Sequence, residues 1–217
     1  MVFFVDPELA RMREEYAQSG LHETTAGNDP FVLFAKWLSD AVAAGIVEPN
    51  AMALATASAD GKPSVRIVLL KGFDLAGAVF YTNYDSRKGR ELEANPHAAA
   101  VMLWHPLQRQ VRIEGAVSRV DPAESDDYFA DRPRGSQLGA VSSPQSQVVS
   151  GRSELEVHFD RVESHFAGRS VERPEHWGGY RMEIHTIEFW QGRQNRMHDR
   201  LLFERNPTGW DVERLAP

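Results

Sequence analysis

The spacing of the apolar residues changes from helical to strand-like near position 51, and this change constrains the fold more than any other feature. A helix is predicted at 31–44, because Asp29-Pro30 is typical of a helix start and an apolar stripe follows at helical spacing. From position 51 onwards, short apolar segments alternate with turns rich in Gly, Pro, Asn and Asp. Segments 51–58 and 64–71, which are joined by such a turn, are typical of a β-hairpin.

The remaining elements follow from the same patterns. Further strands are predicted at 78–83, 97–104, 108–120, 180–184, 186–190, 199–205 and 210–215, with a turn at 72–77. Further helices are predicted at 7–19, 86–94, 122–131, 136–140 and 151–166. Many antiparallel strands wrapped by a few helices favour a β-barrel core, so we expect one α+β domain over residues 1–217.

Composition and charge exclude several classes of protein. The net charge of −7 and the isoelectric point near 5.6 argue against a general nucleic-acid binder, whose affinity depends on neutralising phosphates. The chain has no cysteine and no HExxH motif, so thiolate catalysis is excluded and no metal site is predicted. No apolar run is long enough to span a membrane and no signal segment opens the chain, so we expect a soluble, cytoplasmic protein that binds no membrane.

The segment from Arg196 to Arg200 is the most informative one for function. In a strand, Arg196, His198 and Arg200 would share one face, where like charges repel unless an anion lies across them. Apolar residues flank the segment on both sides. These features suggest a pocket for a phosphate or a flat, charged ring. The alternative is an exposed strand face whose cations pair with Glu188 or Glu204.

Two other cationic positions are candidates for binding an anion. Arg66 lies in an otherwise apolar run, and because an unpaired buried guanidinium is costly, its partner is either a carboxylate or a phosphate. Strict alternation places Arg66 and Lys71 on opposite strand faces. Ser86, Arg87 and Lys88 open a helix directly after a strand, where free backbone N–H groups favour an anion; the alternative is a helix cap with solvated charges.

Several further polar groups can each be interpreted in two ways. The loops at 132–137 and 143–146 are dense in hydrogen-bond donors, although each is also an ordinary turn. Gln110 and Arg112 point together from a strand, where they could contact the carbonyl edge of a ring or simply pair with Glu114.

Together these segments closely resemble the pyridoxine (pyridoxamine) 5′-phosphate oxidase family, which binds FMN. The resemblance runs in one order from about Arg13 to the last residue. The matching segments are 66–71 (RIVLLK), 79–82 (VFYT), 86–88, 109–111, 128–129, 132–133, 136–140, 145–146, 177–179, 187–192 (IEFWQG), 196–200 (RMHDR) and 214–217 (RLAP). Met197 departs from the family pattern, which usually has Leu between the Arg and the His.

The resemblance implies a Greek-key-like, antiparallel, FMN-binding split β-barrel with peripheral helices. It implies a homodimer with FMN in clefts between the subunits, in which residues 174–217 complete the site and the dimer interface. Residues 1–28 would supply an N-terminal helix and a lid segment.

The resemblance also implies roles for individual residues. The FMN phosphate and ribityl chain would be bound by Arg66, Thr82, Arg87, Lys88 and Ser146, within a cofactor-binding set that also includes Ile67, Val68, Leu69, Leu70 and Lys71. Tyr81, Gln110, Gln145, Trp190 and Arg200 would contact the rest of the cofactor. The substrate phosphate would bind Lys71, Tyr128, Arg132 and Ser136, the substrate ring would lie near the catalytic Arg196 and His198 with Met197 between them, and Arg13 and Tyr16 would belong to the lid.

The implied activity is an oxidase that converts pyridoxine 5′-phosphate or pyridoxamine 5′-phosphate to pyridoxal 5′-phosphate. Hydride would pass from substrate C4′ to flavin N5, and O2 would accept the electrons to give hydrogen peroxide, with ammonia released from the amine. The alternatives are an oxidase of the same fold for another aromatic substrate, as in phenazine biosynthesis, a non-catalytic flavin or pyridoxal-phosphate carrier, and a deazaflavin-dependent reductase. The complete substrate-phosphate set, together with Arg196 and His198, favours the vitamin B6 oxidase.

Overall fold

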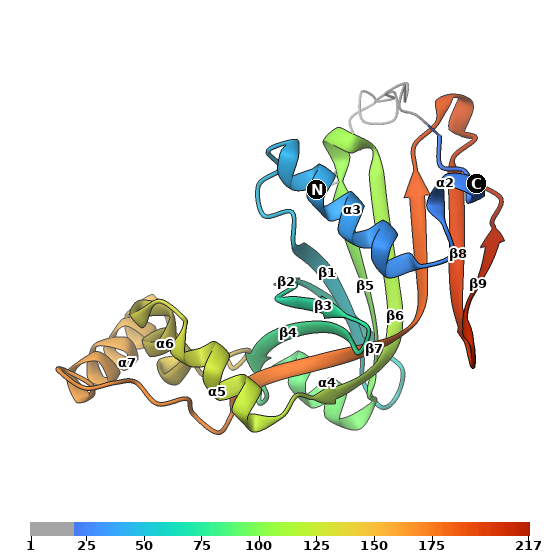
Figure 1. Ribbon diagram of the computed structural model, residues 1–217. Coiled ribbons are helices and arrows are strands. Elements are labelled where there is room, and N and C mark those ends of the chain that lie inside the picture. Colours follow the sequence, from blue (N-terminus) through green and yellow to red (C-terminus); the bar gives the residue numbers. More distant parts are fainter. Residues whose placement is uncertain (1–19) are drawn as a thin grey trace, which may run out of the picture.

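The computed structural model describes residues 20–217, in which a long antiparallel sheet is covered by helices (Figure 1). After the short α2 (Glu23–Ala26), helix α3 (Pro30–Ala43) begins where the sequence predicts. The Asp29 side chain accepts a hydrogen bond from the Phe31 N–H, and Pro30 occupies the first turn. The predicted helix end at Ala44 is one residue beyond the observed end.

The strands confirm most of the predicted positions. They are β1 (Ala51–Ala57), β2 (Pro63–Leu69), β3 (Gly72–Asp74), β4 (Gly77–Asn83), β5 (His97–Trp104), β6 (Arg109–Arg119), β7 (Trp177–Gln191), β8 (Asp199–Asn206) and β9 (Gly209–Arg214). Their order is β2-β1-β5-β6-β7-β4-β3, with β8 pairing β7 and β9. Every pairing is antiparallel, as expected. The predicted turn at 72–77 instead contains β3, which pairs with β4.

Strand β7 is one 15-residue strand, whereas the sequence predicts two shorter ones. The interruption that the sequence indicates is a β-bulge, because the pairing of β6 with β7 shifts register between Glu114 and Gly115. A Cβ atom at Gly115 would lie 1.7 Å from the Glu183 carbonyl oxygen, so this close approach requires glycine. Beyond the bulge the strand changes neighbours: its first part pairs with β4 and its last part with β8.

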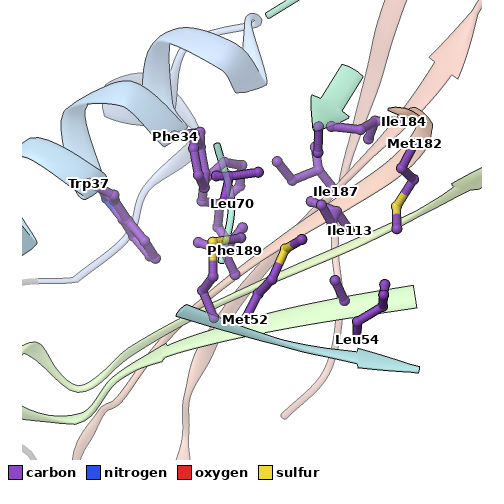
Figure 2. Packing of buried hydrophobic residues seen from close by; sticks show 14 of the residues in the cluster. Phe34, Trp37, Met52, Leu54, Leu70, Ile113, Met182, Ile184, Ile187 and Phe189 are labelled. Carbon is purple, nitrogen blue, oxygen red and sulfur yellow. The ribbon is translucent and has the colours of Figure 1, made fainter. Parts of the chain in front are cut away.

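The main core lies between α3 and the sheet. Phe34 and Trp37 of α3 are almost fully buried and pack with Met52, Ile113 and Phe189 from three different strands (Figure 2). Burying each large apolar side chain contributes about 1.5–3 kcal/mol to stability. The strand pairing and the apolar stripe of α3 therefore both identify the same face of the sheet as the buried one.

The remaining helices gather at the other end of the sheet. They are α4 (Arg87–Ala94), α5 (Pro122–Ala130), α6 (Arg134–Ser142) and α7 (Arg152–His165). Helices α5, α6 and α7 form an arm beside the start of β7 (Figure 1), with a second core of Phe129, Leu138, Val171 and Trp177. Within the part of the chain that the structure describes, no helix is both long and apolar enough to cross a membrane.

Candidate active site

A cavity of about 780 Å³ opens where β2, β4 and α4 meet the helical arm. All nine residues predicted to bind the cofactor phosphate and ribityl chain or the substrate phosphate line it. The predicted residues in its wall are Arg66, Ile67, Val68, Leu69, Lys71, Tyr81, Thr82, Arg87, Lys88, Tyr128, Arg132, Ser136, Gln145 and Ser146. The sequence analysis missed four others, Ser64, Val65, Pro133 and Trp177. Of these, Pro133 and Trp177 carried a signal, because each lies in a segment that matches the family.

Arg66 projects from β2 into this wall and has a carboxylate partner. Its Nη1 donates to Thr56 Oγ1 at 2.6 Å and to the Leu54 carbonyl at 3.2 Å, and its Nη2 lies 3.3 Å from Glu91 Oε2. Burial lowers the pKa of Arg66, although the guanidinium stays protonated. Arg66 and Lys71 line the same cavity despite the alternation rule, because β2 ends at Leu69 and Lys71 lies beyond the strand.

Glu91 of α4 was not predicted, yet it organises this wall. Its side chain is almost fully buried and accepts hydrogen bonds from Thr56 and Ser64 at 2.5 Å each and from Arg87 Nε at 2.8 Å. Burial alone would raise the pKa of Glu91, but these hydrogen bonds outweigh it and lower the pKa to about 2. The available sequence signal was the spacing of four residues from Arg87 on one helix.

Lys88 provides a buried cation in the same wall. Its Nζ donates to Thr82 Oγ1 at 2.9 Å and to Gln145 Oε1 at 3.0 Å. Burial, with a further contribution from the charge of Arg66, lowers the pKa of Lys88 to about 8. Ser86 caps α4 by accepting a hydrogen bond from the Gly89 N–H, as the helix-cap interpretation predicts, although Lys88 is buried and not solvated. The helix start, Lys88 and Arg66 make this wall suited to a phosphate.

A second cation that could bind an anion, Arg132, lies beside a stack of three aromatic rings. The Tyr81 and Tyr128 rings are 3.8 Å apart, and Trp177 continues the stack nearly parallel to both. The Arg132 guanidinium lies 4.5 Å from the centre of the Trp177 ring. Arg132 Nε is buried and has no hydrogen-bond partner among residues 20–217, so it is a donor that a ligand can satisfy.

The other predicted residues that the structure describes do not line this cavity. Gln110, Trp190 and Arg200 lie directly opposite one another on β6, β7 and β8, so they form one row across the sheet. This row is at the end of β7 that is remote from the helical arm (Figure 1). Arg196 and His198 lie next to it, just before β8. One chain therefore holds two separate groups of candidate residues.

The strand predicted at 199–205 is confirmed as β8, but residues 196–198 do not extend it, so the strand-face interpretation of 196–200 fails for its first half. Arg196 ends a 3-10 turn (Gln194–Arg196), and strand β8 begins only at Asp199. Asn195 and Arg196 have positive φ angles of 56° and 60°, a left-handed backbone that breaks the alternation. Arg196 consequently does not share a strand face with Arg200. Arg200 pairs with Glu188, as the alternative interpretation has it, but neither side chain is exposed as that interpretation requires.

His198 is held in a defined orientation. Its Nδ1 lies 3.1 Å from the Arg193 backbone nitrogen, which donates to it, and its ring lies 4.6 Å from that of Trp190. Burial and the nearby Arg196 charge lower the pKa of His198. At neutral pH the imidazole is therefore uncharged with its proton on Nε2, which makes it a hydrogen-bond donor at that atom.

The remaining predicted site residues are Leu70, Met197, Arg13 and Tyr16. Leu70 points into the main core beside α3 (Figure 2), so its side chain lies away from the cavity. Met197 is largely exposed. Arg13, Tyr16 and the helix predicted at 7–19 lie outside the described residues.

Comparison with known proteins agrees with this geometry. Residues 38–166 match the family model described as pyridoxamine 5′-phosphate oxidase, and residues 177–217 match the pyridoxine 5′-phosphate oxidase C-terminal dimerisation region. A pyridoxine/pyridoxamine 5′-phosphate oxidase from Rubrobacter xylanophilus is 55% identical over 97% of each chain. One from Synechocystis is 54% identical over 96% of this chain and 98% of its own. The crystal structure of PhzG from Burkholderia lata, in complex with tetrahydrophenazine-1-carboxylic acid, superposes with a TM-score of 0.83 at 33% identity, covering 88% of this chain and 94% of that one.

The antiparallel sheet, its peripheral helices and these matches define an oxidoreductase of the split-barrel class. The chain belongs to the pyridoxamine 5′-phosphate oxidase family. The family, fold and enzyme class predicted from the sequence are therefore confirmed. The match to a dimerisation region also supports the predicted homodimer.

Proposed function

We propose that this chain is an FMN-dependent oxidase that converts pyridoxine 5′-phosphate or pyridoxamine 5′-phosphate to pyridoxal 5′-phosphate. Oxygen would be the electron acceptor, with hydrogen peroxide as a product and ammonia released from the amine. The observation that carries the proposal is the pairing of two anion positions in one cavity: the Arg66 and Lys88 wall, and the Arg132 position beside the aromatic stack. A phosphorylated cofactor and a phosphorylated substrate together require two such positions.

The residues of the first wall fit the phosphate of FMN. Arg66, Arg87 and Lys88 supply positive charge, and Thr82 and Ser146 add hydroxyl groups to the lining of the cavity. When bound, FMN would supply the hydride acceptor, at N5, for the hydrogen that leaves substrate C4′. Glu91 would keep the two arginines in place, since it already binds both.

The second group of residues would complete the site from the other subunit. Gln110, Trp190 and Arg200 are remote from the cavity of their own chain, so one chain cannot bring them to the ligand bound there. In a dimer with twofold symmetry, a contact between two different surfaces, one from each subunit, occurs twice. We infer that each cofactor lies between subunits, in contact with the cavity of one and the row of the other.

The substrate would be held by its phosphate and oriented at its ring. Lys71, Tyr128, Arg132 and Ser136 would bind the phosphate, and the buried Nε of Arg132 gains the acceptor that it lacks. Binding energy from this remote group can position C4′ for reaction. Arg196 would polarise the ring substituents, while His198 would assist in orienting the substrate.

The visible spectrum of the purified protein tests the proposal directly. We expect a flavin spectrum that bleaches when pyridoxine 5′-phosphate is added without oxygen, and that recovers in air as pyridoxal 5′-phosphate forms. A flavin spectrum that is indifferent to this substrate would favour another oxidase of the same fold. Protein that does not take up FMN would contradict the proposal.

Cofactor affinity should fall as pH rises through the pKa of Lys88, which is about 8 before the cofactor binds. Only the protonated amine attracts the phosphate, so the FMN dissociation constant should be flat below pH 8 and rise by at most about tenfold per pH unit above it. Flavin fluorescence quenching between pH 7 and 10 measures this. In Lys88→Met, binding should be weaker at pH 7 and this rise should disappear; a wild-type profile in that variant would exclude Lys88 as its origin.

A further inference from the structure

Glu188 of β7 is a buried carboxylate to which no step of the proposed reaction assigns a role. It is 5% exposed and lies on the same sheet face as the row of Gln110, Trp190 and Arg200. Arg200 Nε donates to its Oε1 at 2.8 Å and Arg200 Nη2 to its Oε2 at 3.2 Å. Arg112 Nη1 also donates to Oε2, at 3.0 Å. One carboxylate therefore binds two arginines.

The two arginines depend on Glu188 to different degrees. Arg112 has a second carboxylate partner, Glu114, on its own strand. Arg200 has no other carboxylate partner among the described residues; its remaining contact is a hydrogen bond from Nη1 to the Ala216 carbonyl, at 2.9 Å. Consistent with this dependence, the bond to Glu188 raises the pKa of Arg200.

The contacts of Arg200 leave part of its guanidinium available to a ligand. A guanidinium has five N–H donors in a fixed plane, and two of these bind Glu188 while a third binds Ala216. One N–H group on each terminal nitrogen is left without a partner in the described part of the chain. The two-point bond to Glu188 fixes the plane, so it also fixes the direction in which the remaining donors point.

We propose that Glu188 is a positioning residue that holds the Arg200 guanidinium in the orientation that contacts the flavin. This inference rests on the proposed function, in which Arg200 contacts the cofactor. Without Glu188, Arg200 keeps its charge but loses the two-point contact. Its side chain then has to become ordered when FMN binds, and this ordering weakens FMN binding.

The test is FMN affinity, measured by fluorescence quenching on the apoprotein of the full chain. Glu188→Gln should raise the FMN dissociation constant by up to about tenfold, because the Arg200 side chain must then become ordered when FMN binds. Arg200→Gln should have an effect at least as large. In the double variant, Glu188→Gln should cause no further loss, because Arg200 is the residue through which it acts.

A second carboxylate–arginine pair between the same two strands provides a matched control. Glu183 of β7 and Arg205 of β8 lie 3.3 Å apart, but both are exposed. Glu183→Gln should leave FMN affinity within about twofold of wild type, because exposed pairs contribute little.

The outcomes separate the inference from the proposed function. Wild-type protein that does not bind FMN would contradict the proposed function itself. If wild type binds and Glu188→Gln binds equally well or more tightly, only the positioning role is wrong. An equal loss from Glu188→Gln with and without Arg200 would also overturn it, since a general structural defect would then account for the loss. We expect Glu188→Gln to lower the melting temperature both in the wild-type protein and in the Arg200→Gln variant. We expect it to weaken FMN binding only in the protein that still has Arg200.

Discussion

Replacing Arg196 with alanine should reduce turnover of pyridoxine 5′-phosphate by about 100-fold or more while FMN stays bound. The reduction is expected because a fixed donor beside the reacting group stabilises charge that develops in the transition state, and removing one such donor typically has an effect of this size. Retention of FMN is expected because Arg196 lies in the 3-10 turn before β8, outside the row that includes Arg200.

The measurement is the rate of anaerobic flavin bleaching, with the flavin content of each variant determined beforehand. Arg196→Lys is the matched variant, because it keeps the charge and makes the same demand on the left-handed backbone at this position. It should recover part of the lost rate. Loss of bound flavin from Arg196→Ala would mean that Arg196 binds the cofactor, and the proposed role would be wrong.

Replacing Arg66 with alanine should have the opposite effect, with FMN binding weakened by about 10- to 100-fold. A charged hydrogen bond to phosphate is worth about 1.5–3 kcal/mol, which corresponds to this range. The fold should survive, because Glu91 keeps hydrogen bonds from Arg87, Thr56 and Ser64 after Arg66 is removed.

Riboflavin, which lacks the phosphate, makes this experiment specific. Arg66→Ala should weaken binding of FMN but leave binding of riboflavin within about twofold of wild type, because the proposed contact is to phosphate. Arg205→Ala removes an exposed arginine of β8 and should change neither affinity. Equal losses for FMN and riboflavin would show that Arg66 does not bind the phosphate.

The sequence predicts the local structure well and the long-range structure poorly. The strand at 97–104 and the start of α3 are correct, because alternation and the Asp-Pro helix start are local signals. The single strand β7 was divided in two, since a bulge interrupts alternation in the same way that a turn does. The left-handed backbone at Asn195 and Arg196 was not predicted, because neither residue is a glycine, which would have indicated it. Strand order depends on pairings between distant segments, which spacing does not encode.

The candidate site shows the same division. The cationic wall was predictable as a list of residues, because Arg66 in an apolar run and Lys88 at a helix start each signal an anion. Its organiser, Glu91, was not, because a helical glutamate near an arginine normally forms a surface pair. The separation of Arg200 from the cavity could not be read from the sequence either, since it depends on how β7 crosses the sheet.

The position of the two residue groups at opposite ends of β7 has a genetic consequence. On the proposed arrangement, each catalytic unit takes its cavity from one polypeptide and its Arg200 row from the other. A defect in the cavity and a defect in the row, carried by two different alleles, would then meet in one unit of a mixed dimer and leave the other unit wholly normal. Two alleles that are each inactive alone could therefore complement one another.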